Sequence, residues 1–76
     1  MSSEPRRVRV TSYAGYRAEQ EPRRFVLDGQ SHDIAEIVRR WREPGADCFV
    51  VRTSGGPGFE LCHDHGTDSW SAKTHG

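Results

Sequence analysis

The chain has 76 residues, enough for one small domain and too few for two separate hydrophobic cores. Its 11 basic and 11 acidic side chains give a formal net charge of zero, which argues against a protein that coats nucleic acid by charge alone. No run approaches the ~18 apolar residues of a membrane span, so we expect no membrane contact. We predict a single domain over 1–76, with an ordered core at about 7–71 and frayed termini.

The first predicted elements are a strand and a hairpin. Val8 and Val10 alternate with polar residues, which is typical of a half-buried strand. Further along, the apolar run 25–27 is followed by Asp28-Gly29, the strongest short signal for a hairpin, because both central residues of a type I′ turn need positive φ. This turn places Leu27 opposite Gln30 and Phe25 opposite His32.

The segment that follows, 31–42, fits two patterns. Ile34, Ile37, Val38 and Trp41 match the i, i+3, i+4, i+7 spacing of a helix, and simple alternation fits them less well. A single bulge near residues 35–36 would restore the alternation by shifting it once. The preceding hairpin turn favours the strand, since residues directly after it must pair back with 23–27.

The second hairpin is clearer. Phe49 and Val51 alternate on one strand, Phe59 and Leu61 on the next, and the segment 53–58 between them is rich in turn residues. Pairing centred on Gly55 puts Phe49 opposite Leu61, Val51 opposite Phe59 and Cys48 opposite Cys62. A turn at 65–68 then leads to a short closing strand that carries Trp70.

These residues resemble a family of small bacterial proteins of unknown function. The family's skeleton reads roughly Pro-x-x-Phe-x-x-x-Gly-x-x-Tyr-x-Val, then Trp, a Tyr-Phe-x-Val strand and a closing His-Asp…Trp, and it covers about residues 22–70. The chain departs from it at His32, where the family tends to have Tyr, and at Cys48, where it tends to have an aromatic residue. Similar segments are attached to proteins related to Y-family lesion-bypass DNA polymerases. The resemblance implies a compact all-β fold, no established activity, and an accessory role near DNA.

Together these patterns predict an all-β fold, a small antiparallel, partly open barrel or roll of about five strands. The alternative is an α+β fold in which residues 32–42 form a helix. The predicted core comprises Val8, Val10, Phe25, Leu27, Ile34, Ile37, Trp41, Phe49, Val51, Phe59, Leu61 and Trp70.

Catalytic and metal sites find little support in the sequence. The run 62–65, Cys-His-Asp-His, lacks the paired ligand spacing of a zinc site, and neighbouring residues of a strand point to opposite faces. Cys62 with a nearby histidine lacks an oxyanion loop, and the glycines at 55–58 lack the Lys-Ser/Thr of a phosphate loop. We therefore expect no enzyme and no cofactor. The N-terminus lacks a signal peptide, so we expect a cytoplasmic protein in which Cys48 and Cys62 are thiols. The alternative is a cross-strand disulfide, which their facing positions would permit.

Binding is the function that the sequence favours. Arginines surround Trp41 and precede Phe25, and arginine beside an exposed aromatic ring is how small β modules hold single strands. We predict a non-catalytic module that acts through a protein partner, received on an unpaired strand edge or an aromatic patch. The alternative is weak single-stranded nucleic-acid binding, as in a DNA-repair accessory. The candidate residues for either partner are Arg23, Arg24, Arg39, Arg40, Arg42 and Tyr16.

Overall fold

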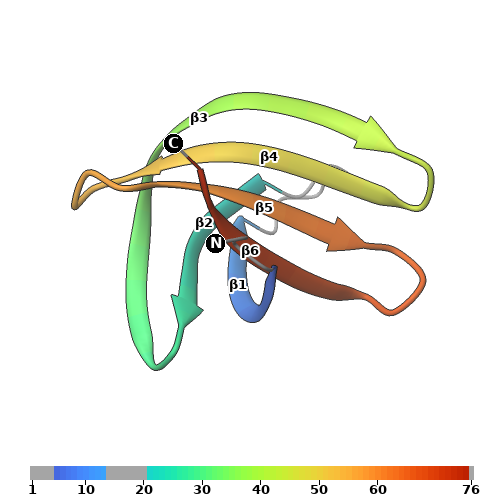
Figure 1. Ribbon diagram of the computed structural model, residues 1–76, viewed down its shortest axis with the longest axis horizontal. Coiled ribbons are helices and arrows are strands. Elements are labelled where there is room, and N and C mark those ends of the chain that lie inside the picture. The colour runs from blue at the N-terminus through green and yellow to red at the C-terminus, as the bar shows by residue number, and fades with distance from the viewer. Residues whose placement is uncertain (1–4, 14–20, 76) are drawn as a thin grey trace.

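The computed structural model describes residues 5–13 and 21–75, and within these all regular structure is β (Figure 1). Six strands follow one another along the chain: β1 (Arg6–Tyr13), β2 (Glu21–Leu27), β3 (Gln30–Glu43), β4 (Ala46–Thr53), β5 (Gly58–Asp64) and β6 (Ser69–His75). Each pairs antiparallel with the next, and β6 pairs with β1, which closes a barrel. The all-β antiparallel prediction is confirmed. The ring is closed and has six strands, where the sequence predicted a partly open one of about five.

The turns explain why the chain reverses where it does. Asp28 and Gly29 have φ values of 53° and 79°, so the predicted turn forms and sets Phe25 opposite His32. The turn at Pro44-Gly45, which the sequence analysis did not identify, joins β3 to β4. Its glycine has a φ of 79° and follows a proline, as in a type II turn.

The ambiguous segment is a strand with two bulges. The pairing of β3 with β4 shifts between Ile34 and Glu36 and again between Ile37 and Arg39. The first shift, at Ala35, is the bulge that the sequence predicted, and the helical alternative is wrong. The second shift was not predicted, and it turns each later side chain to the other face of the strand.

One predicted core residue is misplaced as a result. Trp41 lies opposite Cys48 on the outer face of the sheet and is half-buried. The register gives the inward position of this end of β3 to Arg40, whose guanidinium carbon lies 5.8 Å from the ring centroid of Phe49. The aromatic side chain that packs against the core here is instead Trp70 of β6.

The core otherwise matches the prediction. Phe49, Val51, Phe59 and Leu61 meet in the pairs expected from the second hairpin, and His32 lies between the rings of Phe25 and Phe59, at 5.0 and 5.3 Å. The buried cluster consists of Val8, Phe25, Phe49, Val51, Phe59, Leu61 and Ala72, with Val10, Leu27, Ile34, Ile37 and Trp70 packed against it.

Ala72 is the buried residue that the sequence analysis missed. It is 1% exposed and lies opposite Leu61, and β6 continues to His75, beyond the predicted end of the ordered core. A small apolar residue between polar neighbours gives little pattern to detect, and its burial depends on the pairing of β6 with β5.

Candidate partner-binding edge

The long strand β3 pairs with different neighbours along its length. Its first part, Gln30–Asp33, forms a ladder with Arg24–Leu27 of β2, and its second part, Ile34–Glu43, forms a ladder with β4. Beyond Asp33 the strands β2 and β3 diverge, so the second part has no ladder partner on its other side among residues 5–13 and 21–75. Figure 1 shows this part of β3 as the outermost strand of its sheet. We call the unpaired side of Ile34–Glu43 the β3 edge.

An edge of this kind presents backbone groups that another chain can use. In an antiparallel ladder, alternate residues direct both N–H and C=O away from the existing neighbour. The stretch after the second bulge, Arg39–Glu43, pairs with β4 residue by residue without interruption. A regular stretch of five residues is long enough for an added extended segment to form several hydrogen bonds.

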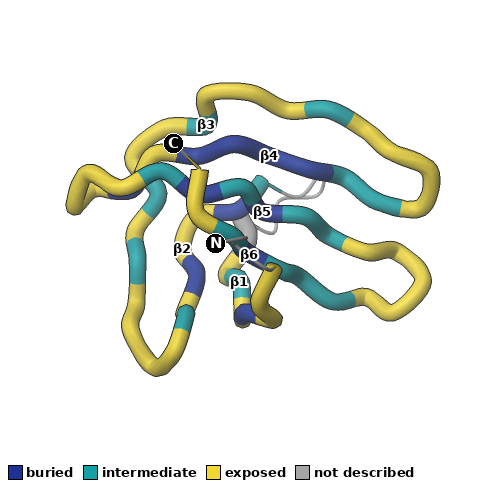
Figure 2. The backbone as a smooth tube through the Cα atoms, in the orientation of Figure 1, coloured by how far each residue is buried: buried dark blue, intermediate teal, exposed yellow. Residues whose placement is uncertain are grey.

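The β3 edge also carries an exposed apolar side chain. Val38, at the second bulge, is 58% exposed, and the other exposed large apolar residue among those described is Val26, at 37%. Figure 2 shows most of β3 as exposed, in contrast to the buried stretch of β4 beside it. An apolar group at an unpaired edge supplies the burial that backbone hydrogen bonds alone do not.

The predicted arginines do not form one free cationic face, because three of them are held by carboxylates. Arg24 pairs with Asp33 at 2.6 Å, Arg40 with Glu21 at 2.7 Å, and Arg42 with Asp47 at 3.0 Å. Arg24 lies on β2, opposite Asp33 in the first part of β3, and Tyr16 lies outside the described residues.

The other two predicted arginines are Arg23 and Arg39. Arg23 is exposed and occupies the position where the pairing of β1 with β2 shifts, and it also has an interaction partner. Arg39 is exposed, and its guanidinium carbon lies 5.5 Å from the ring centroid of Trp41. Within the described part of the chain, no carboxylate lies within ion-pair distance of Arg39.

A row of aromatic rings extends from Phe49, beside Arg40, through Trp70 to the two histidines of the β5–β6 end. Trp70 stacks on Phe49 at a centroid distance of 5.8 Å and on His63 at 4.6 Å. His63 in turn contacts His65 edge to face at 5.1 Å. Because Trp70 stacks on two aromatic rings and packs against the core, it serves as packing rather than as a free platform for a nucleotide base.

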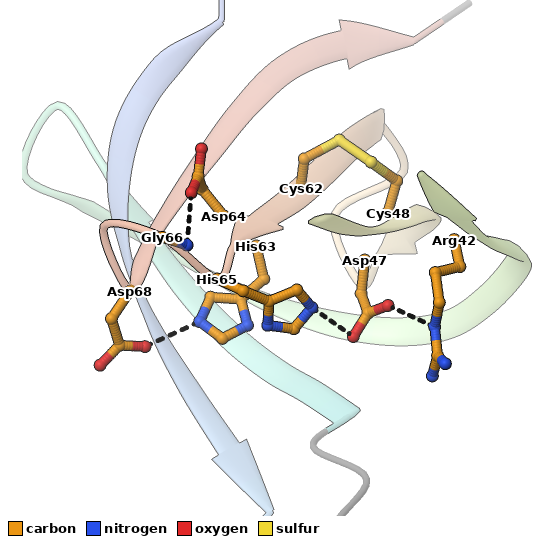
Figure 3. A network of polar contacts seen from close by, with 9 residues as sticks. All are labelled: Arg42, Asp47, Cys48, Cys62, His63, Asp64, His65, Gly66 and Asp68. Carbon is orange, nitrogen blue, oxygen red and sulfur yellow. Dashed lines mark hydrogen bonds and ion pairs between the residues drawn. A yellow bond between two sulfur atoms is a disulfide. The ribbon is translucent and has the colours of Figure 1, made fainter. Parts of the chain in front are cut away.

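The two histidines belong to a polar network at the end of the sheet (Figure 3). His63 Nε2 forms a hydrogen bond with Asp68 Oδ1 at 2.9 Å. The carboxylate of Asp47 lies 3.1 Å from His65 Nε2 and 3.0 Å from Arg42 Nε. Each imidazole therefore has its own carboxylate. Among the residues that the structure describes, no group of three or more His, Cys, Asp or Glu side chains converges as a metal site would require.

Two carboxylates have shifted pKa values. The guanidinium of Arg40 lowers the pKa of Glu21 by hydrogen bonding, so this ion pair is a side-chain link across the gap between β2 and the β3 edge. The backbone N–H groups of Thr67 and Gly66 donate to Asp64 and lower its pKa, which stabilises the turn between β5 and β6.

A disulfide joins Cys48 and Cys62, whose Cα atoms lie 4.1 Å apart in directly opposite positions of β4 and β5. The predicted pairing of these residues is confirmed, and the expectation of two thiols is wrong. That expectation rested on an assumed reducing compartment rather than on the geometry. Cys48 is fully buried, and the disulfide lies on the opposite side of the sheet from the histidines (Figure 3). The histidines therefore have no free thiol beside them.

Comparisons with known proteins add no evidence about the function of this site. No family model, no curated protein and no solved structure matches the chain. The described part of the chain contains no helix that is long and apolar enough to cross a membrane.

The sequence analysis found the arginines and missed the feature that makes their strand available. A signal was present in Val38, since one bulge aligns Ile34, Ile37 and Trp41 and leaves Val38 as the apolar residue without a place in the core. No comparable sequence signal predicts that β2 and β3 separate after Asp33, because this separation arises from the curvature of the barrel.

Proposed function

We propose that the protein is a non-catalytic binding module that receives a segment of a partner protein along the β3 edge. The observation that carries the proposal is that, among residues 5–13 and 21–75, Ile34–Glu43 pairs with β4 alone, while the neighbouring strand β4 is paired on both sides. Strand addition to such an edge obtains its affinity from main-chain hydrogen bonds and its specificity from side chains beside them. Val38 provides an apolar contact at the same place.

The test compares two valines that are both exposed and both on strands. Val38→Asp places a charge on the β3 edge, and Val26→Asp places the same charge on β2, away from that edge. Each variant and the wild type are used to capture proteins from a lysate of the source organism, with and without nuclease treatment. We expect a partner that the wild type and Val26→Asp retain and Val38→Asp loses, with no effect of nuclease.

Other outcomes would contradict the proposal. Capture that is unchanged in Val38→Asp would place the interaction elsewhere on the molecule. Capture of no protein, or capture that nuclease abolishes, would argue against protein docking as the function.

Weak single-stranded nucleic-acid binding is the second candidate, and one contact favours it. Arg39 beside Trp41 combines a guanidinium with an aromatic ring, as in single-strand-binding sites. The carboxylates that hold Arg24, Arg40 and Arg42 would have to be displaced by phosphates, so we rank this function second. A dT12 titration at low salt tests it, with loss of binding expected when the candidate arginines are changed to glutamate.

A further inference from the structure

The charges along the β3 edge indicate what kind of segment it would receive. Arg39, Arg40 and Arg42 follow one another within its regular stretch. The two glutamates of the strand already have partners, since Glu36 pairs with Arg52 of β4 and Glu43 accepts a hydrogen bond from the indole of Trp41.

The outer face of this stretch has one cation without a carboxylate. Arg39 shares the outer face with Trp41, whereas Arg40 and Arg42 share the opposite face and pair with Glu21 and Asp47. The guanidinium of Arg39 lies over the indole ring, and within the described residues no carboxylate lies at ion-pair distance from it. An incoming side chain directly beside Arg39 would therefore meet a positive charge and a partly buried aromatic ring.

Pairing of two copies of the chain is unfavourable when Arg39–Trp41 forms the centre of the shared ladder. Every antiparallel register centred between Arg39 and Trp41 places at least one arginine opposite another arginine, as inspection of the run 39–42, Arg-Arg-Trp-Arg, shows. Like charges directly opposite each other destabilise a ladder. The same arginines would favour a strand that carries carboxylates at these positions.

We propose that the β3 edge selects an extended acidic segment of a partner protein, with a carboxylate beside Arg39 and an apolar residue against Val38 or Trp41. This inference rests on the proposed function, because it names the chemistry of the segment that docks there. The edge supplies the hydrogen bonds, and Arg39 supplies the preference for negative charge.

The test uses three eight-residue peptides in which valine alternates with glutamate, glutamine or lysine. Binding to the full chain is followed by fluorescence anisotropy and by backbone amide shifts in NMR spectra. We expect the glutamate peptide to bind about tenfold more tightly than the glutamine peptide, and the lysine peptide to bind most weakly. The shifted amides should fall within Arg39–Glu43, and the preference should weaken as salt is raised.

Two variants assign the preference to one side chain. Arg39→Gln should remove most of the difference between the glutamate and glutamine peptides. Arg9→Gln is the matched control, since Arg9 is an exposed strand arginine of β1 that likewise has no carboxylate partner among the described residues, and it should leave the difference unchanged.

The outcomes separate this inference from the proposed function. Equal affinities for the glutamate and glutamine peptides, with shifts in Arg39–Glu43, would overturn the acidic preference and leave strand docking in place. The absence of shifts in Arg39–Glu43 with every peptide would overturn both. Tighter binding of dT12 to the same amides, or a dimer in sedimentation experiments that protects them, would show that the edge serves nucleic acid or a second copy instead.

Discussion

The adjacent strands β3 and β4 differ in how they are paired and in how far they are buried. β4 has a ladder on each side, and its residues Cys48–Val51 are buried. Within the described part of the chain, Ile34–Glu43 of β3 has a ladder on one side, and it is largely exposed (Figure 2). Both segments contain valine and aromatic residues. Position in the sheet, rather than β propensity, therefore decides which strand holds the fold together and which is available to a partner.

The contrast gives a division of roles that substitutions can test. Changes on β4 should lower the free energy of unfolding and affect binding only through the loss of folded protein. Changes to the exposed side chains of the β3 edge should alter binding and leave stability almost unchanged.

The largest expected effect comes from Phe49→Ala on β4. Phe49 is 6% exposed and stacks on Trp70, so truncation should lower the free energy of unfolding by about 3–5 kcal/mol. Urea denaturation followed by circular dichroism measures it. The control is Val38→Ala on the β3 edge, which should cost less than about 0.5 kcal/mol. Equal losses in the two variants would contradict the division between the strands.

The disulfide between β4 and β5 should give the next largest effect. It links residues 14 apart in sequence, and the loss of such a link should cost about 3 kcal/mol. Dithiothreitol should therefore lower the urea midpoint of the wild type. It should have no effect on the Cys48→Ala/Cys62→Ala double variant, which starts from a lower midpoint. A wild-type midpoint that is insensitive to full reduction would show that the strand pairing does not depend on this bond.

The smallest expected effect concerns the ion pair between Glu21 and Arg40. Arg40 holds the pKa of Glu21 below its ordinary value of 4.5, so the folded state favours the charged carboxylate. The stabilisation is present above pH 4.5 and is lost as the pH falls through the lower pKa of the folded state. Because both groups are exposed, we expect a contribution on the order of 0.5 kcal/mol.

The measurement compares the urea midpoints of the wild type and Glu21→Gln at neutral and acidic pH. The wild type should lose more stability than the variant on acidification, and the two should converge at low pH. A variant that matches the wild type at every pH would show that β2 and the β3 edge are not coupled through this pair.

Much of the fold could be predicted from the sequence because local chemistry determines it. Asp28-Gly29 fixes the first hairpin, and the apolar alternation around Gly55 fixes the second to the exact pairing of Phe49 with Leu61. These signals lie within a few residues of the contacts that they specify. Ala72 and the closure of β6 against β1 depend on contacts across the barrel, for which the sequence offers no local signal.

The candidate site was predictable only in part for the same reason. The arginines around Trp41 are visible in the sequence, and their neutralisation by Glu21 and Asp47 is not, since those partners come from other strands. Trp41 was misplaced because its direction depends on a second bulge at Val38, where no glycine or proline marks the irregularity.

The two bulges of β3 also set a rule for how the length of this strand can change. Each bulge reverses which side chains face inward, so the pair returns Arg40 to the face of Ile34. Because Ala35 and Val38 are each one residue in excess of the ladder, deleting either one would leave every remaining residue of β3 opposite its present partner on β4. Arg40 would still face inward and Trp41 outward. The strand should therefore tolerate shortening by a single residue at these two positions, whereas a deletion in the uninterrupted stretch after them would move side chains to the wrong face.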